Sequence, residues 1–118
     1  MVSIVESSQS DSNWNNRLIN SNYATIYQTK EIAIIYSKQN LIPKYITFLN
    51  NNGKIIAQLL AFESIRFEKK KFLSKFLVNF PNIKKSSYTW SYGPIIFDTK
   101  YSTEIFVQLG KFLKEKNC

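Results

Sequence analysis

Two apolar segments joined by a short polar turn constrain the fold more than any other feature of the sequence. Lys44–Leu49 is rich in β-branched and aromatic residues, and Lys54–Phe62 is almost continuously apolar, as is typical of strands. The turn between them, Asn50-Asn51-Asn52-Gly53, contains an Asn-Gly pair that tolerates positive φ and favours a β-hairpin. The second strand has no polar face and can run on as far as Phe67, so we expect both of its faces to be covered.

The chain before the hairpin predicts two helices. Asp11 or Ser12 is the expected N-cap of a short helix that carries Trp14. Thr29 is the expected N-cap of a second helix that runs to about Lys38. The apolar residues expected to share one face of this second helix are Ile32, Ile35 and Tyr36.

Two segments after the hairpin have the apolar spacing of amphipathic helices. Lys69–Phe80 sets apolar residues opposite lysines, which fits a connecting helix packed on its own sheet and also fits a segment on a membrane surface or in a partner's groove. Thr103–Lys116 ends in a lysine-rich turn that complements the helix dipole. The apolar residues of this last helix are Ile105, Phe106, Leu109, Phe112 and Leu113.

The order of these elements predicts the fold class. A chain of 118 residues with 44% apolar residues is long enough for one core and too short for two. With Val2–Val5 as a first strand, the elements follow the order β-α-α-β-β-(α)-β-α. This order predicts a single α+β domain over residues 1–118, with a mainly antiparallel sheet and flanking helices.

The last predicted strand is interrupted. Thr89–Asp98 places Trp90 and Tyr92 before Gly93-Pro94, and three apolar residues after it. Gly adopts unusual φ values and Pro donates no N–H, so the pair breaks or bulges the strand. Such a break lets a ligand approach the backbone closely, although a buried strand with a kink near a sheet edge has the same pattern. Asp98 is expected to cap a turn rather than act as a base.

The net charge of +8 is concentrated in one region. Within residues 66–85, seven basic residues are opposed only by Glu68, so six of the eight net positive charges lie in twenty residues. The basic residues are Arg66, Lys69, Lys70, Lys71, Lys75, Lys84 and Lys85. This excess indicates a phosphate-bearing ligand, nucleic acid or an anionic surface, and a solvated lysine face fits it as well.

Missing residue types exclude several classes of site. The chain has no His, and its single cysteine is the last residue, Cys118. A Cys/His metal site, a Ser-His-Asp or Cys-His mechanism and an internal disulfide are therefore excluded within one chain. The first residues lack the features of a signal peptide, and no apolar run approaches the ~18 residues of a membrane helix. We expect a cytoplasmic protein without a transmembrane segment.

Four motifs follow one another along the chain. They are an early tryptophan helix (Trp14), the segment Tyr27-Gln28-Thr29-Lys30-Glu31, the turn Asn52-Gly53-Lys54, and Tyr92-Gly93-Pro94-Ile95-Ile96-Phe97-Asp98 followed by a helix. In this order they resemble the N-terminal part of a FemAB-like aminoacyltransferase, the type that forms peptidoglycan bridges, in the GNAT-like acyltransferase superfamily. The chain departs from that pattern where Ile32 replaces a tryptophan, and where Ile35 and Tyr36 stand in place of a substrate-phosphate lysine.

The resemblance implies transfer of an acyl or aminoacyl group to an amine of a cell-envelope or glycan precursor. It implies aminoacyl-tRNA or acyl-CoA as the donor, with no bound cofactor, and stabilisation of a tetrahedral oxyanion. The implied substrate-binding residues are Trp90, Tyr92, Gly93 and Pro94 for the acceptor and Lys69, Lys70 and Lys71 for phosphates. No catalytic residue is identified. The family's sheet continues beyond the last helix, so we expect an incomplete domain that is active only with further parts or a partner.

Two alternatives remain open from the sequence. One is a non-catalytic binding module whose basic region holds an anionic partner, either RNA, including tRNA, or an anionic surface. The other is an inactive truncated fragment. An incomplete domain exposes a sheet edge and an apolar helix face, which predicts a homo-oligomer or a partner that covers the sheet.

Overall fold

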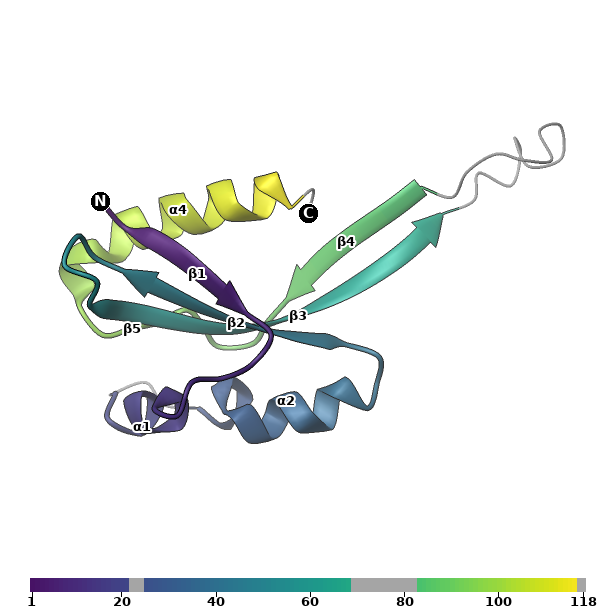
Figure 1. Ribbon diagram of the computed structural model, residues 1–118, viewed down its shortest axis with the longest axis horizontal. Helices are drawn as coiled ribbons and strands as arrows, with labels where there is room; N and C mark the ends of the chain where they lie inside the picture. Colours follow the sequence, from purple (N-terminus) through teal and green to yellow (C-terminus); the bar gives the residue numbers. More distant parts are fainter. Residues whose placement is uncertain (22–24, 69–82, 117–118) are drawn as a thin grey trace, which may run out of the picture.

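An antiparallel sheet forms the centre of the protein. The computed structural model describes residues 1–21, 25–68 and 83–116, with the backbone alone described over 65–68 and 83–86. Four strands lie in the order β1-β2-β3-β4, and a short fifth strand, β5, pairs with β3 (Figure 1). The strands are β1 (Ser3–Ser7), β2 (Ile42–Leu49), β3 (Ile55–Glu68), β4 (Ile83–Thr89) and β5 (Ile95–Ile96). Every pairing is antiparallel, as expected.

The predicted hairpin is the junction of β2 and β3. Gly53 has a φ of 77°, and the Asn50 side-chain oxygen accepts hydrogen bonds from the N–H groups of Asn52 and Lys54 at 2.9 and 3.1 Å. β3 extends to Glu68, one residue beyond the farthest predicted end at Phe67, and its outer part pairs with β4. This outer part of the β3–β4 pair projects beyond the helices (Figure 1).

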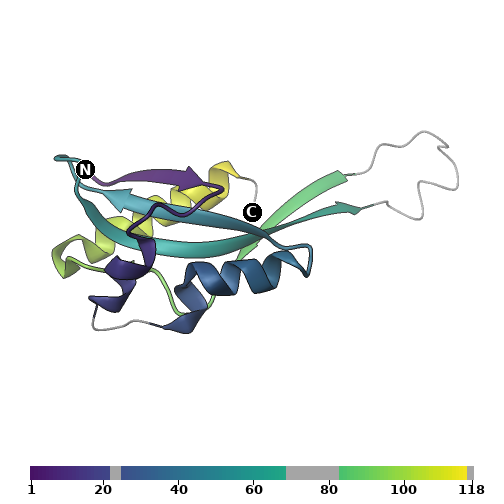
Figure 2. The same cartoon turned by 60° about the horizontal axis from the view of Figure 1, so that its bottom comes forward.

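Helices cover both faces of the sheet (Figures 1 and 2). α1 (Trp14–Ile19) and α2 (Lys30–Ser37) lie on one face, and α4 (Ser102–Glu115) lies on the other. Two 3-10 turns, η1 (Ile26–Gln28) and η2 (Thr99–Tyr101), lead into α2 and α4. The predicted α+β class with a mainly antiparallel sheet is confirmed. The helix predicted over Lys69–Phe80 lies outside the described residues.

β3 contributes to two hydrophobic clusters. Ala57, Leu59 and Ala61 are fully buried in a cluster with Ile105 and Leu109 of α4. The alternate residues Leu60 and Phe62 are buried in a second cluster with Trp14 and Ile32. Because successive side chains of a strand point to opposite faces, this alternation places an apolar layer on each side. The expectation that β3 is covered on both faces is confirmed.

One of the two predicted N-caps is correct. The Thr29 hydroxyl accepts a hydrogen bond from the N–H of Ile32 at 3.4 Å and caps α2. The prediction of Asp11 or Ser12 as the N-cap of α1 is wrong, because that position is Asn13. The Asp11 carboxylate accepts the Asn13 N–H at 2.9 Å and pairs with Arg17, so it lies just before the helix start.

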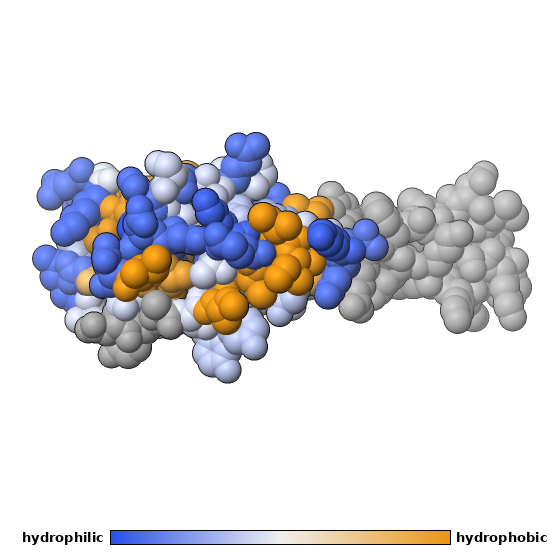
Figure 3. Space-filling model, turned by 90° about the horizontal axis from the view of Figure 1, so that it is seen from below, coloured by the Kyte–Doolittle hydropathy of each residue, from blue (hydrophilic) through white to orange (hydrophobic). Residues whose placement is uncertain are grey.

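The predicted apolar faces of the helices are too wide. Ile35 is 52% exposed and Phe106 is 55% exposed, whereas α2 buries Ile32 and Ala33 and α4 buries Ile105 and Leu109. A short helix that lies on a flat sheet buries only the stripe that faces the strands. Figure 3 views the α1–α2 side of the molecule and shows apolar residues at its surface. Four exposed isoleucines belong to α1, η1 and α2. They are Ile19, Ile26, Ile34 and Ile35. In the described part of the chain, no helix has the length and apolar character needed to cross a bilayer.

Candidate functional site

The strand opposite β3 is broken at Trp90–Pro94. β4 pairs Thr89 with Phe62, and β5 pairs Ile95 with Gln58. Five residues of the broken strand therefore lie opposite the three residues Leu59–Ala61. The predicted interruption of this strand is confirmed, and it consists of two extra residues between two paired segments. Strand irregularities of this kind are common beside binding sites.

The side chain of Gln28 fills the gap in the ladder. Its Oε1 accepts the Leu60 N–H at 2.7 Å, and its Nε2 donates to the Leu60 carbonyl at 3.1 Å. The same Nε2 donates to the Ser91 carbonyl at 2.8 Å. If the register of β4 continued, Ser91 would stand opposite Leu60, so the amide lies where a direct strand pairing would otherwise form. Gln28 is fully buried and replaces a peptide group of the missing strand.

A chain of hydrogen bonds that runs through α1 and β3 holds Gln28 in place. The Trp14 indole N–H donates to the Gln28 backbone carbonyl at 2.8 Å, and the Trp14 carbonyl accepts from Gln58 Nε2 at 3.1 Å. Arg17 Nε donates to Gln58 Oε1 at 2.9 Å, and its guanidinium forms two hydrogen bonds with Asp11 at 2.6 and 3.0 Å. Among the side chains that the structure describes, no buried polar atom lacks a partner. Satisfied buried networks hold their members in one arrangement.

Gly93 is required by close packing at the break. A Cβ added at this residue would lie 2.6 Å from Leu59 Cδ1 and 3.3 Å from the Gln28 side-chain amide. The Gly93–Pro94 peptide is cis. The Trp90 indole N–H donates to the Gly93 carbonyl at 3.2 Å and closes the turn. The need for Gly here comes from this close approach.

Tyr92 presents an aromatic surface at the break. Its φ is 58°, in the left-handed region that a bulky side chain rarely adopts. The ring is 70% exposed and stacks on Tyr27, with centroids 5.3 Å apart and planes inclined by 26°. A tyrosine held in this conformation with its ring in solvent contributes little to the core. Strained residues of this kind cluster at binding sites.

A small cleft adjoins the stacked tyrosines. Its volume is about 80 Å³. The residues that line it come from η1, α2, the residue before β2, β3, the end of β4 and the break, and they are Tyr27, Tyr36, Leu41, Phe62, Thr89, Trp90 and Ser91. None of these side chains is charged, so the cleft offers aromatic surface and hydroxyl groups to an uncharged part of a ligand.

Asp98 is outside this cleft. Its carboxylate accepts the Lys100 N–H at 3.3 Å and caps η2, and its other oxygen lies 3.9 Å from Lys100 Nζ. The expectation that Asp98 caps a turn is confirmed. Among the described residues, no group of three His, Cys, Asp or Glu side chains could hold a metal ion.

Four of the seven sequence-predicted site residues lie together at the break, namely Trp90, Tyr92, Gly93 and Pro94. Lys69, Lys70 and Lys71 lie outside the described residues. Gln28 and Tyr27 were not predicted as site residues, although both belong to the segment Tyr27-Gln28-Thr29-Lys30-Glu31. The position of Gln28 between an aromatic residue and a helix N-cap was the only local sign of its role. Its partner Ser91 is 63 residues away, so the sequence does not show the contact.

Comparison with known proteins gives no relative. No family model, no curated protein and no solved structure matches the chain.

Proposed function

We propose that the chain is an acyl- or aminoacyl-transferase-like domain, of the FemAB-like type within the GNAT-like superfamily, that holds an amine acceptor at the Trp90–Pro94 break. One observation carries the proposal: two of the motifs on which the resemblance rests meet in space. Gln28 bonds to Ser91, and Tyr27 stacks on Tyr92. The segments are more than sixty residues apart, yet together they build one exposed aromatic site.

The site is suited to orienting an acceptor. The stacked rings of Tyr27 and Tyr92 offer a flat face to a sugar or a peptide side chain, and the uncharged cleft beside them accepts an apolar or hydroxylated group. Holding an amine against an activated carbonyl supplies much of the rate in such transfers. Attack of the amine on the ester or thioester carbonyl would form a tetrahedral oxyanion. Its collapse would leave the new amide bond and break the ester or thioester bond, and the tRNA hydroxyl or CoA thiol would leave with the proton that the amine loses.

An acyl-transfer assay tests the proposal. The purified chain is incubated with labelled aminoacyl-tRNA or acyl-CoA and an amine acceptor, either an amino sugar or a lysine-containing peptide. We expect label in the acceptor once a candidate second half of the domain is added, and we expect Tyr92→Ala to lower that rate by roughly tenfold because the stacked surface is lost. Phe106→Ala is the matched control, since Phe106 is an exposed aromatic residue of α4 on the opposite side of the sheet.

Two outcomes count against the proposal. One is the absence of transfer with every donor, including after addition of a candidate second half of the domain. The other is an equal loss of rate in both variants. The alternative function as a binding module for RNA or another anionic partner predicts a different pattern. Binding would weaken steeply with salt, would be lost when Lys69, Lys70 and Lys71 are replaced by Ser, and would be unaffected by Tyr92→Ala.

A further inference from the structure

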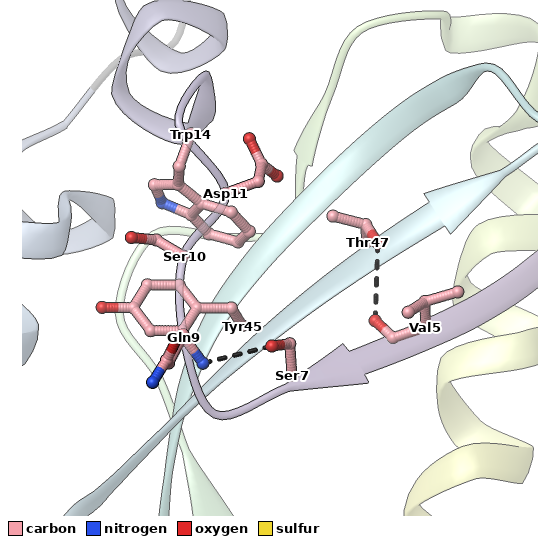
Figure 4. Close-up of a pocket in the computed structure, with 8 residues that line it drawn as sticks. All are labelled: Val5, Ser7, Gln9, Ser10, Asp11, Trp14, Tyr45 and Thr47. Atoms are coloured by element: carbon pink, nitrogen blue, oxygen red, sulfur yellow. Dashed lines mark hydrogen bonds between the residues drawn. The ribbon is translucent and has the colours of Figure 1, made fainter.

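A second and larger cavity lies away from the break, between the end of β1 and the start of α1. Its volume is about 350 Å³, at the lower end of the roughly 300–1,000 Å³ typical of small-molecule sites. Figure 4 shows the residues that line it. They are Val5, Ser7, Gln9, Ser10, Asp11, Trp14, Tyr45 and Thr47.

Two cross-strand pairs form the floor of this cavity. Val5 lies opposite Thr47, and Ser7 lies opposite Tyr45, in the β1–β2 ladder. These four side chains share one face of the sheet, because residues two apart on a strand point the same way. The loop after β1 and the Trp14 ring form the wall (Figure 4). The cavity is therefore built on regular strands, which fix its floor.

The wall is also fixed in position. Trp14 is 1% exposed and meets Tyr45 edge to face, with ring centroids 5.0 Å apart. Its indole N–H is held by the Gln28 carbonyl at 2.8 Å. Asp11 is held by Arg17 and by the Asn13 N–H. A ligand that enters would meet groups already in place, which lowers the entropic cost of binding.

The charge of the cavity excludes a strongly charged ligand. Asp11 is its one ionisable acid or base other than the Tyr45 phenol. Arg17 neutralises Asp11 through two hydrogen bonds and holds the pKa of that carboxyl below its ordinary value. An anion would face the carboxylate, and a cation would compete with a guanidinium that is already in place. An uncharged ligand is neither repelled by the carboxylate nor in competition with the guanidinium.

The polar groups of the cavity are mostly hydroxyls. Thr47 Oγ1 donates to the Val5 carbonyl at 3.5 Å and Ser7 Oγ accepts the Gln9 N–H at 3.1 Å, which leaves acceptor sites on Thr47 and the proton of Ser7 for a ligand (Figure 4). The Ser10 and Tyr45 hydroxyls and the Gln9 side-chain amide add further donors and acceptors. Burial raises the pKa of the Tyr45 phenol, so its proton stays in place. Mixed donors and acceptors beside the apolar surfaces of Val5 and the Trp14 ring complement a ring that carries several hydroxyl groups.

We infer that this cavity binds one uncharged, polyhydroxylated ring, a single sugar unit, between the β1–β2 floor and the Ser10–Asp11 wall. The site is separate from the aromatic break, and it stands whether or not the chain transfers acyl groups.

The test is a titration of the ¹⁵N-labelled chain followed by NMR. The probes are glucose, its anionic analogue glucuronate and its cationic analogue glucosamine. We expect glucose to give saturable shifts of the amide signals of residues 7–11 and 45–47, and we expect both charged analogues to bind more weakly. Thr47→Val removes one hydroxyl at nearly constant shape, and Ser10→Ala removes a second. Each should weaken glucose binding roughly fivefold, the effect of one lost neutral hydrogen bond.

Thr103→Val is the matched control, because Thr103 is exposed on α4 and does not line the cavity. It should leave glucose binding unchanged. The spectrum of each variant without sugar shows whether the variant is folded. The inference is overturned if glucose gives no saturable shift, if the shifts lie elsewhere, if glucuronate binds as well as glucose, or if folded Thr47→Val binds as tightly as the wild type. None of these outcomes depends on acyl transfer, so the proposed function can fail or succeed separately.

Discussion

Replacing Gln28 by methionine removes the side-chain amide that fills the broken ladder while keeping a side chain of similar length. The Leu60 N–H and carbonyl would lose their partners at 2.7 and 3.1 Å in a fully buried position. The carbonyl of Ser91 would lose its partner too, but Ser91 is exposed and water can replace that bond. Each buried backbone group left without a partner costs about 1–3 kcal/mol, so Gln28→Met should lower the free energy of unfolding by about 2–6 kcal/mol.

Urea unfolding followed by tryptophan fluorescence measures this change. A small domain is stable by about 5–15 kcal/mol, so the loss is a large fraction of the total. With a slope of about 1–3 kcal/mol per M urea, the midpoint should fall by an amount on the order of 1–3 M. Gln39→Met is the control, because Gln39 is exposed and its replacement should change stability by no more than about 0.5 kcal/mol. Equal midpoints for the two variants would show that the amide does not substitute for a strand.

Three further predictions concern the break and its support. Gly93→Ala should destabilise the protein by about 1–3 kcal/mol in urea unfolding, because the new Cβ would lie 2.6 Å from a methyl carbon of Leu59. Gly110→Ala is the control in α4, where a new Cβ meets nothing within 4 Å, and it should stabilise the protein by about 0.5–1 kcal/mol. The opposite order of stabilities would contradict the close packing at Gly93. Tyr92→Gly removes the strain of the left-handed backbone and also removes the stacking of Tyr92 on Tyr27, two effects of similar size and opposite sign. The free energy of unfolding should therefore change by less than about 1 kcal/mol, while acceptor binding is lost. A large loss of stability would show that the ring has a structural role instead. Arg17 keeps the pKa of Asp11 low. The stability that Asp11 contributes is therefore present above the ordinary aspartate pKa of about 3.9 and is lost as the pH falls below it. The difference in unfolding free energy between the wild type and Asp11→Asn should shrink on acidification, and a constant difference would exclude the ion pair as its source.

Local signals in the sequence were sufficient for the sheet and its hairpin. The Asn-Gly turn, the apolar run of β3 and the Thr29 cap each depend on neighbours within a few residues. The Gly-Pro pair likewise predicted the break, because its effect on the ladder is intrinsic to those two residues. These features depend on the backbone preferences of single residues or neighbouring pairs, which can be read from the sequence.

The supporting contacts of the site depend on distant pairs and could not be predicted in this way. Gln28 reads as an ordinary polar residue beside a helix start, and only the fold brings it against Leu60 and Ser91. The wrong cap at Asp11 has a local cause, because its carboxylate accepts the Asn13 N–H and pairs with Arg17, six residues further on, instead of capping α1. The wrong burial of Phe106 has another cause, since helical spacing states which residues share a face but not how much of that face the sheet covers.

If the break held by Gln28 is the acceptor site, a bound acceptor must shift the amide signals of that segment in the ¹⁵N-labelled chain. A lysine-containing peptide acceptor is titrated into the wild type, Tyr92→Ala and the control Phe106→Ala. We expect saturable shifts at Tyr27, at Ser91–Gly93 and at the Trp90 indole, absent in Tyr92→Ala and unchanged in Phe106→Ala. Shifts confined to other parts of the chain, or shifts at the break that persist in Tyr92→Ala, would contradict that assignment.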